Sequence, residues 1–258
     1  MGTVIFSDVH ADAEALSLVA AYIRDPSFPI YFGPVDTLVN LGDLLHRGNC
    51  PETTLEIIHD LARGFRLVSV MGNHDHAFLK GVPVSGSDGM SAYRHEQLRG
   101  SPLLDIFSEM PMEWVNRSML FVHGGPLDLG TQTLRLKCWQ RLSHTAGDSF
   151  TGYHYTAPMA FDALEKRGLF FMVCGHQHTH ICCRKTMDGI REHLIRFERD
   201  KDAVVPVGET EVARIPLDIP TLFRIGGCHG DRPEFAYADD TTFTYIRLTR
   251  GTRRSSSI

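Results

Sequence analysis

Short clusters of aspartate, asparagine and histidine recur along the chain, and these residue types can bind metal ions or transfer protons. In chain order the clusters read SDVH, GDLLHRG, GNHD, HGG and GHQH. They supply two carboxylates, one amide and four imidazoles as potential ligands, namely Asp8, His10, Asp43, Asn73, His123, His176 and His178. This mixture of oxygen and nitrogen donors suits Mn, Fe, Zn or Co rather than Mg alone, which prefers oxygen and water. A single such cluster is also typical of a polar turn, so the evidence lies in the whole set.

Each cluster follows a short apolar run that has the character of a β-strand. The runs are TVIF at 3–6, TLVNL at 37–41, RLVSV at 66–70, MLFV at 119–122 and LFFMVC at 169–174. Unbroken runs of this length are typical of strands buried on both faces of a central sheet. The carboxyl ends of parallel strands lie along one edge, where α/β folds bind ligands. We therefore expect the seven side chains to converge at one edge.

Helical patterns separate the first three runs. Asp12 is a suitable N-cap for a helix whose apolar residues recur at helical spacing, and Pro51 can begin a second helix that ends near Gly64. Alternating strands and helices predict βαβ units and a parallel sheet. The C-terminal third changes to alternating polar and apolar residues, at 189–197 and 241–250, which predicts an added antiparallel sheet.

Seven ligands exceed the needs of one ion and suit two adjacent ions, about 3.5–4 Å apart and bridged by a carboxylate. Glycine lies beside the clusters, where it allows the backbone to turn sharply, at Gly42, Gly72, Gly124, Gly125 and Gly175. The ordered set of clusters therefore predicts a dinuclear metal centre.

The set Asp-x-His, Gly-Asp, Gly-Asn-His-Asp, His-Gly-Gly and Gly-His-x-His resembles the calcineurin-like metallophosphoesterase superfamily, and residues 224–248 are similar to its closing strands. The resemblance implies an α/β fold, a four-layer α/β/β/α sandwich with the active site at the C-terminal ends of the strands. It also implies that one ion takes Asp8, His10, Asp43 and His178, and that the other takes Asp43, Asn73, His123 and His176. Asp43 would then bridge the two ions.

The activity implied by this resemblance is hydrolysis of phosphate esters through attack by a hydroxide that bridges the two ions, which also neutralise the phosphate oxygens. His74 is the candidate to protonate the leaving oxygen or to stabilise the transition state. Arg47 resembles an arginine of the phosphoprotein-phosphatase branch that grips phosphate with its planar fork. Asp75 either orients His74 or accepts backbone hydrogen bonds at the start of a helix.

The motifs depart from each branch of the superfamily in part. The phosphoprotein-phosphatase branch has GDxxDRG, whose second Asp orients the histidine of GNHE, whereas this chain has His46 and Asp75 at those places. The GHQH cluster resembles the bacterial phosphodiesterase-like branch instead. Phosphomonoesters (including phosphoproteins), phosphodiesters and dinucleoside polyphosphates all remain open as substrates. The alternative is a non-catalytic metal-binding scaffold of the same fold.

Composition bears on the partners and the cellular compartment expected for this protein. The net charge of −5 argues against nucleic acid as a partner. No apolar run approaches the roughly 20 residues that span a bilayer, and the first residues do not resemble a signal peptide. The six cysteines contain no CxxC pair, which favours reduced thiols and a cytoplasmic protein. Composition predicts no oligomeric state.

We expect one domain over residues 1–258, with lid-like insertions at about 77–118 and 126–168 and a flexible tail at 250–258. The segment 135–144 groups three basic residues with a tryptophan. It is interpreted as an amphipathic helix with a solvated basic face, and the alternative is a wall that binds phosphate. His59 is interpreted as structural, whereas His76, His180 and His229 are weighed as supports for the ligands.

Overall fold

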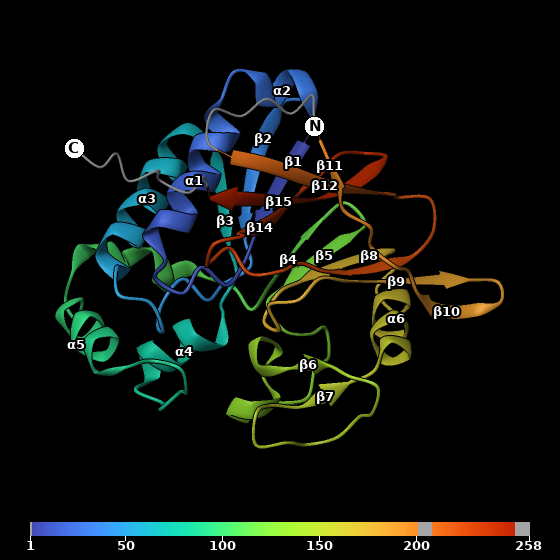
Figure 1. Ribbon diagram of the computed structural model, residues 1–258. Coiled ribbons are helices and arrows are strands. Elements are labelled where there is room, and N and C mark those ends of the chain that lie inside the picture. Colours follow the sequence, from blue (N-terminus) through green and yellow to red (C-terminus); the bar gives the residue numbers. More distant parts are fainter. Residues whose placement is uncertain (1, 201–207, 251–258) are drawn as a thin grey trace.

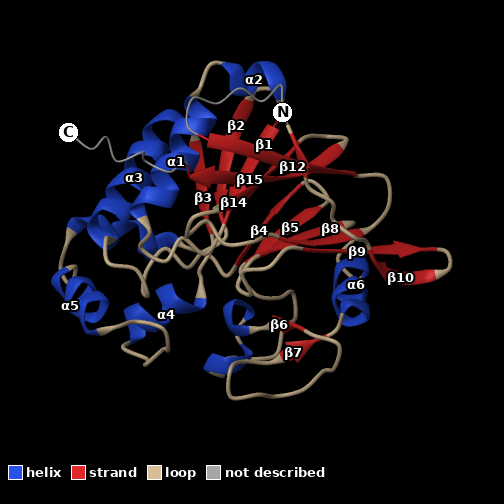
Figure 2. Cartoon of the chain, in the orientation of Figure 1, coloured by secondary structure: helices blue, strands red, loops and turns tan. Residues whose placement is uncertain are grey.

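The computed structural model describes residues 2–200 and 208–250, and the expected tail at 250–258 lies outside these ranges except for Arg250. Two large β-sheets face each other, and helices cover their outer faces (Figures 1 and 2). This is the four-layer α/β/β/α arrangement that the sequence predicted.

The first sheet has seven strands. Their order is β11 (Glu198–Arg199), β12 (Gly208–Pro216), β15 (Thr242–Arg250), β14 (Glu234–Ala238), β1 (Gly2–Phe6), β2 (Val35–Asn40) and β3 (Arg66–Ser69). β1, β2 and β3 run parallel to one another, whereas β14 pairs with β1 in the antiparallel sense. The carboxyl ends of β1, β2 and β3 therefore share one edge.

The second sheet has six strands and a parallel core of its own. Their order is β10 (Gly189–Glu192), β9 (Ile181–Thr186), β13 (Thr221–Arg224), β8 (Phe171–Cys174), β5 (Met119–Val122) and β4 (Glu113–Asn116). β13, β8 and β5 are parallel. A separate parallel pair consists of β6 (Arg141–Leu142) and β7 (His154–Tyr155).

The helices divide between the sheets and the long connections. Three helices lie on the side of the first sheet, namely α1 (Ala13–Arg24), α2 (Ser27–Tyr31) and α3 (Pro51–Gly64). The helix α6 (Ala157–Glu165) lies on the side of the second sheet. The connection before β4 contains α4 (Asn73–Lys80), α5 (Gly89–Gln97) and the 3₁₀ helix η1 (Pro102–Glu109). Two short 3₁₀ turns, η2 (Thr133–Arg135) and η3 (Lys137–Trp139), precede β6.

Three apolar clusters account for the four layers, because each fills one space between adjacent layers. The first packs Leu16 and Leu55 of the helices against Val4. The second lies between the sheets and includes the stacked rings of Phe223 and Phe243, whose centroids are 4.0 Å apart. A third cluster packs α6 on the second sheet. Every sheet face thus has an apolar partner, which is the condition for a stable layered domain.

All five predicted strands are confirmed, but the expectation of one central sheet is wrong. The first three runs form β1, β2 and β3, whereas the last two form β5 and β8 of the other sheet. The expectation of an added antiparallel sheet is also wrong, because β12, β14 and β15 extend the first sheet and β9 and β10 extend the second. Periodicity identifies a strand but not its sheet, since the partner is chosen by contacts far along the chain.

The two predicted helices are confirmed as α1 and α3, and Asp12 caps α1 by accepting a 3.0 Å hydrogen bond from the Ala15 N–H. The predicted helix at 135–144 is wrong, because this segment is η3 followed by β6. The cysteines are free thiols. Within the described ranges no helix is long and apolar enough to span a membrane.

Candidate metal centre

The seven predicted ligands come from the ends of strands in both sheets and meet between them. The backbone N–H of His176, after β8, donates a 2.9 Å hydrogen bond to Asp8 Oδ2, after β1. The His123 ring, after β5, donates from Nδ1 to the carbonyl of Leu41 after β2, at 2.7 Å. These cross-sheet bonds bring the carboxyl ends of the two parallel cores together, as the convergence argument requires, although the ends belong to two sheets.

The two carboxylates each have one anchored oxygen and one free oxygen. Asp8 Oδ2 and Asp43 Oδ1 accept hydrogen bonds from the N–H groups of His176 and His74, at 2.9 and 2.8 Å. The other oxygens, Asp8 Oδ1 and Asp43 Oδ2, are buried and accept no hydrogen bond from any described residue. Asp43 Oδ2 lies 3.2 Å from His123 Nε2 and 3.8 Å from His10 Nε2. A buried carboxylate oxygen that lacks a well-formed hydrogen bond is stabilised by a nearby cation, so these atoms fit metal ligands.

Backbone carbonyls orient two of the imidazoles. His10 donates from Nδ1 to the Leu45 carbonyl at 3.2 Å, just as His123 does to Leu41. Since a carbonyl only accepts, Nδ1 of each ring carries a proton, and Nε2 of each ring is directed toward the carboxylates. The protein thereby selects the tautomer that can bind a metal through Nε2.

The ligand atoms form overlapping groups. Asp8, His10 and His178 make one group, and Asp43, His123 and His176 make another, each with its ligand atoms within 4.8 Å of one another. Asn73 Oδ1 joins the second group at 3.1 Å from His123 Nε2. A third grouping, His10, Asp43 and His74, shares residues with both. The first two groups match the division implied by the family resemblance, and Asp43 lies between them.

Electrostatics in the cluster also favour cations. Burial lowers the pKa of His10 to about 3 and that of His176 well below its usual range, so both rings are neutral, as a ligand must be. Burial also lowers the pKa of His123, but the carboxylates of Asp43 and Asp8 outweigh it and raise that pKa to about 9. The two buried carboxylates thus favour a protonated His123 ring. A metal ion in the same place could compensate their negative charge instead.

Left-handed backbone is concentrated at the ligands. Five of the seven have positive φ, namely Asp8 (54°), His10 (51°), Asp43 (58°), His176 (69°) and His178 (57°). Such backbone costs about 1–3 kcal/mol at a non-glycine residue and clusters at functional sites. The surrounding fold therefore stabilises these costly turns, and the turns place the side chains of the proposed ligands.

Two glycines allow the turns after β2 and β3 to touch. A Cβ on Gly42 would lie 2.4 Å from the Gly72 nitrogen, and one on Gly72 would lie 2.2 Å from Asp43 Oδ1. Gly42 also has a φ of 98°. A side chain at Gly42 would collide with the backbone of Gly72, and one at Gly72 would collide with Asp43, so both sharp turns require glycine, as expected from the sequence.

The three candidate catalytic residues take different places. Arg47 Nη2 lies 3.4 Å from His74 Nε2, and the ring centroids of His74 and His10 are 4.8 Å apart. The Asp75 carboxylate accepts from the N–H groups of Asp43 and Leu45, at 2.7 and 3.1 Å. Asp75 therefore contacts the turn that carries Asp43.

His46, which replaces the aspartate of the phosphoprotein-phosphatase pattern, lies beside His74 with the ring centroids 5.5 Å apart. His74 Nδ1 is buried and has no hydrogen-bond partner among residues 2–200 and 208–250. Burial lowers the pKa of His74, and Arg47 lowers it further. Arg47 contacts Nε2 of this ring, so it does not replace the missing carboxylate as a partner of Nδ1.

A hollow of about 360 Å³ opens over the ligands. It is lined by Asp43, Arg47, Asn73, His74, Arg141, His176, Gln177 and His178. Arg141 donates from Nε to the Thr151 carbonyl at 3.1 Å and is the basic residue of 135–144 that reaches the hollow. The neighbouring Arg135 pairs with Asp148 instead. The helix predicted over 135–144 did not distinguish Arg141, which lines the hollow, from Arg135, which does not. The only signal in the sequence was the grouping of basic residues with Trp139.

Of the three histidines weighed as supports, His229 contacts a ligand directly. Its Nε2 lies 2.9 Å from His178 Nδ1, while His178 Nε2 lies 3.2 Å from Asp8 Oδ1. The loop of His229 is anchored to the N-terminal segment, because Gly230 N–H donates to Asp12 Oδ2 at 2.8 Å. His229 can therefore hold the His178 ring with Nε2 toward the cluster.

The other histidines belong to separate contacts. His76 accepts a hydrogen bond from the Trp139 indole at 3.5 Å, and His180 lies 3.1 Å from Glu234. His59, on α3, donates a 3.2 Å hydrogen bond from Nε2 to the Leu103 carbonyl, which fits the structural role expected of His59.

Comparison with known proteins agrees with this arrangement. The sequence model of the calcineurin-like phosphoesterase family matches residues 1–180, a span that contains all seven ligands. A search of curated protein sequences gave no match.

Several solved structures share the fold. A metallophosphoesterase from Sphaerobacter thermophilus is 21% identical, with a TM-score of 0.61 over 97% of this chain and 90% of that one. A protein serine/threonine phosphatase from Saccharomyces cerevisiae is 12% identical, with a TM-score of 0.58 over 99% and 82%. A mutant of a cold-active protein tyrosine phosphatase is 16% identical, with a TM-score of 0.56 over 97% and 80%. At these identities the likeness concerns the fold.

Proposed function

Because this chain belongs to the calcineurin-like phosphoesterase family, we propose that it hydrolyses phosphate esters with the help of two metal ions. The residues that would hold the ions are Asp8, His10, Asp43, Asn73, His123, His176 and His178. The observation that carries the proposal is the place of Asp43, whose free Oδ2 lies near His10 of one ligand group and His123 of the other. When bound, such a pair of ions acidifies water and neutralises phosphate oxygens.

The protein's own cations would position the phosphate. Arg47 and Arg141 line the hollow from different segments of the chain. A guanidinium can give two parallel hydrogen bonds to phosphate, and its charge compensates the oxygens as they gain charge during in-line attack. Two such groups suit the dianion of a phosphomonoester better than the single charge of a diester. We therefore propose monoesters as the preferred substrates.

His74 would act on the leaving group. It lines the same hollow, and Arg47 contacts its Nε2. An imidazole at this position can give a proton or a hydrogen bond to the leaving oxygen as the P–O bond breaks. Asp75 would act through the backbone, because its bonds to Asp43 and Leu45 hold the turn that carries the shared carboxylate.

The test compares p-nitrophenyl phosphate with bis-p-nitrophenyl phosphate, using protein stripped of metal and then loaded with Mn²⁺. We expect turnover only after loading, with a higher kcat/KM for the monoester. Preference for the diester would overturn the monoester assignment and leave a phosphodiesterase. If the loaded protein turned over neither ester, the alternative of a metal-binding scaffold would replace the enzyme.

A further inference from the structure

The ring of His74 contacts imidazoles that belong to two different sites. On one side it meets His10 of the metal-ligand group, with centroids 4.8 Å apart. It also meets His46, at 5.5 Å, and His46 in turn contacts His95 at 5.2 Å and Phe78 at 5.8 Å. These aromatic contacts lead from the metal-ligand cluster into the connection that holds α4 and α5.

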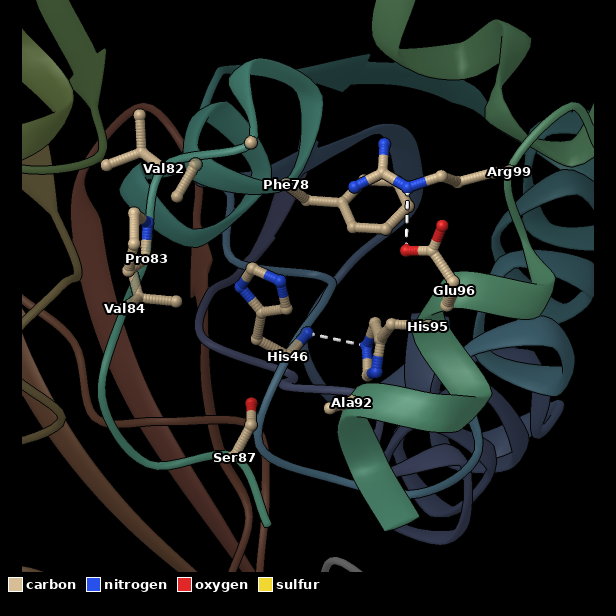
Figure 3. Close-up of a pocket in the computed structure, with 12 residues that line it drawn as sticks. His46, Phe78, Val82, Pro83, Val84, Ser87, Ala92, His95, Glu96 and Arg99 are labelled. Atoms are coloured by element: carbon tan, nitrogen blue, oxygen red, sulfur yellow. Dashed lines mark hydrogen bonds and ion pairs between the residues drawn. The ribbon is translucent and has the colours of Figure 1, made fainter. Parts of the chain in front are cut away.

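Beyond His46 lies a second pocket of about 280 Å³, here called the His46 pocket (Figure 3). Its walls come from the end of α4, the following loop and one face of α5. The lining residues are His46, Ala77, Phe78, Gly81, Val82, Pro83, Val84, Ser87, Ala92, His95, Glu96 and Arg99. Its volume is close to the lower end of the range for small-molecule sites, about 300–1,000 Å³.

The walls favour an uncharged and flat occupant. Val82, Pro83, Val84 and Ala92 are apolar, and the Phe78 ring forms one end (Figure 3). The two charged residues compensate each other, since Arg99 Nε donates to Glu96 Oε2 at 2.7 Å. The Arg99 guanidinium also lies over the Phe78 ring, 5.0 Å from its centroid. A flat aromatic group can pack on such rings and aliphatic side chains without leaving a charge unpaired.

The His46 pocket is adjacent to the hollow over the proposed ligands, because neighbouring residues of one turn, His46 and Arg47, line the pocket and the hollow. Ser87 lines the pocket, and its hydroxyl accepts a 2.9 Å hydrogen bond from the backbone N–H of Arg47. The preceding N–H, that of His46, donates at 2.7 Å to His95 Nε2, as Figure 3 shows. Both Arg47 and His46 have a φ of 67°, so the α5 side of the pocket fixes a strained turn that borders both sites.

We propose that the His46 pocket binds the organic part of the phosphate ester and selects a flat, uncharged aromatic group. The inference rests on the proposed function, in which His74 serves the leaving oxygen. A group attached to that oxygen lies on the His74 side of the phosphate, and from there the contact with His46 leads to the pocket. The substrate class is therefore aryl phosphates, in preference to phosphates of small polar alcohols.

The test fills the pocket and measures selectivity. Ala92 faces the pocket from α5 (Figure 3), so Ala92→Leu reduces its volume without changing charge. Gln97→Leu makes a similar surface change on the same helix outside the pocket. For each metal-loaded protein, kcat/KM is measured with 2-naphthyl phosphate and with glycerol 2-phosphate, and the ratio of the two values is compared. Because each ratio is referred to the wild type, the greater intrinsic reactivity of the aryl ester cancels.

We expect Ala92→Leu to lower this ratio about tenfold or more, mainly through KM of the naphthyl ester, and Gln97→Leu to leave it unchanged. An unchanged ratio in Ala92→Leu, or an equal loss in both variants, would overturn the pocket. If the wild type hydrolysed neither ester, the proposed function would fail, and the pocket would be judged by binding of 2-naphthol, followed by its fluorescence. Weaker binding to Ala92→Leu than to Gln97→Leu would then support the pocket, and equal or absent binding would overturn it.

Discussion

The two sides of the hollow are built in different ways. The side with the seven proposed metal ligands takes its residues from five strand ends, and six of the seven side chains are buried, with Asp8 and His123 fully enclosed. The proposed substrate side takes Arg141 from the short strand β6, within a long connection, and the His46 pocket from α4, α5 and the loop between them. One side is fixed by the sheets, and the other by long connections.

This difference explains what each side can tolerate. A ligand at the end of a buried strand is held by hydrogen bonds across the two sheets, so its place depends on the whole fold. A residue in a connection can change while the sheets remain, because loops vary more than the elements they join. We expect damage on the ligand side to abolish catalysis, and damage on the substrate side to change affinity or selectivity.

The largest effect is expected from Asp43→Asn. This change keeps the size of the side chain but removes the charge that both ligand groups share. Losing an ion costs several kcal/mol of transition-state stabilisation, so kcat/KM should fall about 10⁴-fold or more. Elemental analysis should show fewer than two metal ions per chain. If the variant kept both its metal content and its full activity, damage on the ligand side would not abolish catalysis, and the contrast with the substrate side would fail.

His74→Gln should have the next largest effect, because His74 stands where the two sides meet. We expect kcat to fall about 10²–10⁴-fold while the metal content stays at the wild-type value. Single-turnover rates and elemental analysis of the same preparation separate these readouts. Loss of metal would place His74 among the ligands, in line with its grouping with His10 and Asp43.

Arg141→Ala should weaken substrate binding while the metals are retained. A hydrogen bond to a charged group contributes about 1.5–3 kcal/mol, so KM should rise about 10- to 100-fold. Arg135→Ala is the matched control, because Arg135 forms an exposed pair with Asp148 and does not line the hollow. Its KM should stay near the wild-type value. Equal effects of the two changes would contradict the assignment of Arg141 to the phosphate.

His229→Ala should give the smallest change, on the ligand side. His229 touches the metal site only through His178, and loss of such a contact costs about 10- to 100-fold in metal affinity. We expect the lower end of this range, measured by competition with a chelator, and nearly full activity at saturating metal. His229→Gln, whose amide oxygen can accept from His178 Nδ1, should restore part of the affinity. If Ala and Gln lowered affinity equally, the hydrogen bond would have no part in it.

The convergence of the seven proposed ligands could be predicted from the sequence because two strong regularities coincide there. A buried strand has a distinctive run of residues, and a parallel strand has its functional side chains at its carboxyl end. Thus Asp8 after TVIF and His123 after MLFV could be placed at a common edge without knowledge of the sheets. The same regularities contain no information on pairing, which is why the division of β3 and β5 between two sheets was missed.

The substrate side could not be predicted because long-range contacts determine it. Arg141 and Arg135 have the same chemistry and lie six residues apart, and only the folded segment turns one to the hollow and the other to Asp148. Similarly, the rings that contact His46 come from Phe78 and His95, in a connection without a regular pattern. Spacing along the chain does not report such contacts.

The pairing of β1 with β14 has a consequence for how the protein is made. Thr3 pairs with Ala238, and Cys228 N–H donates to the Ser7 carbonyl at 2.8 Å, so the sheet beside β1 is completed by residues far along the chain. On the ribosome, all seven ligands emerge while β1 still has an open edge, and pairings so distant in sequence are slow to form. The edge of β1 therefore stays open until residues 234–238 have been made, long after the seven proposed ligands.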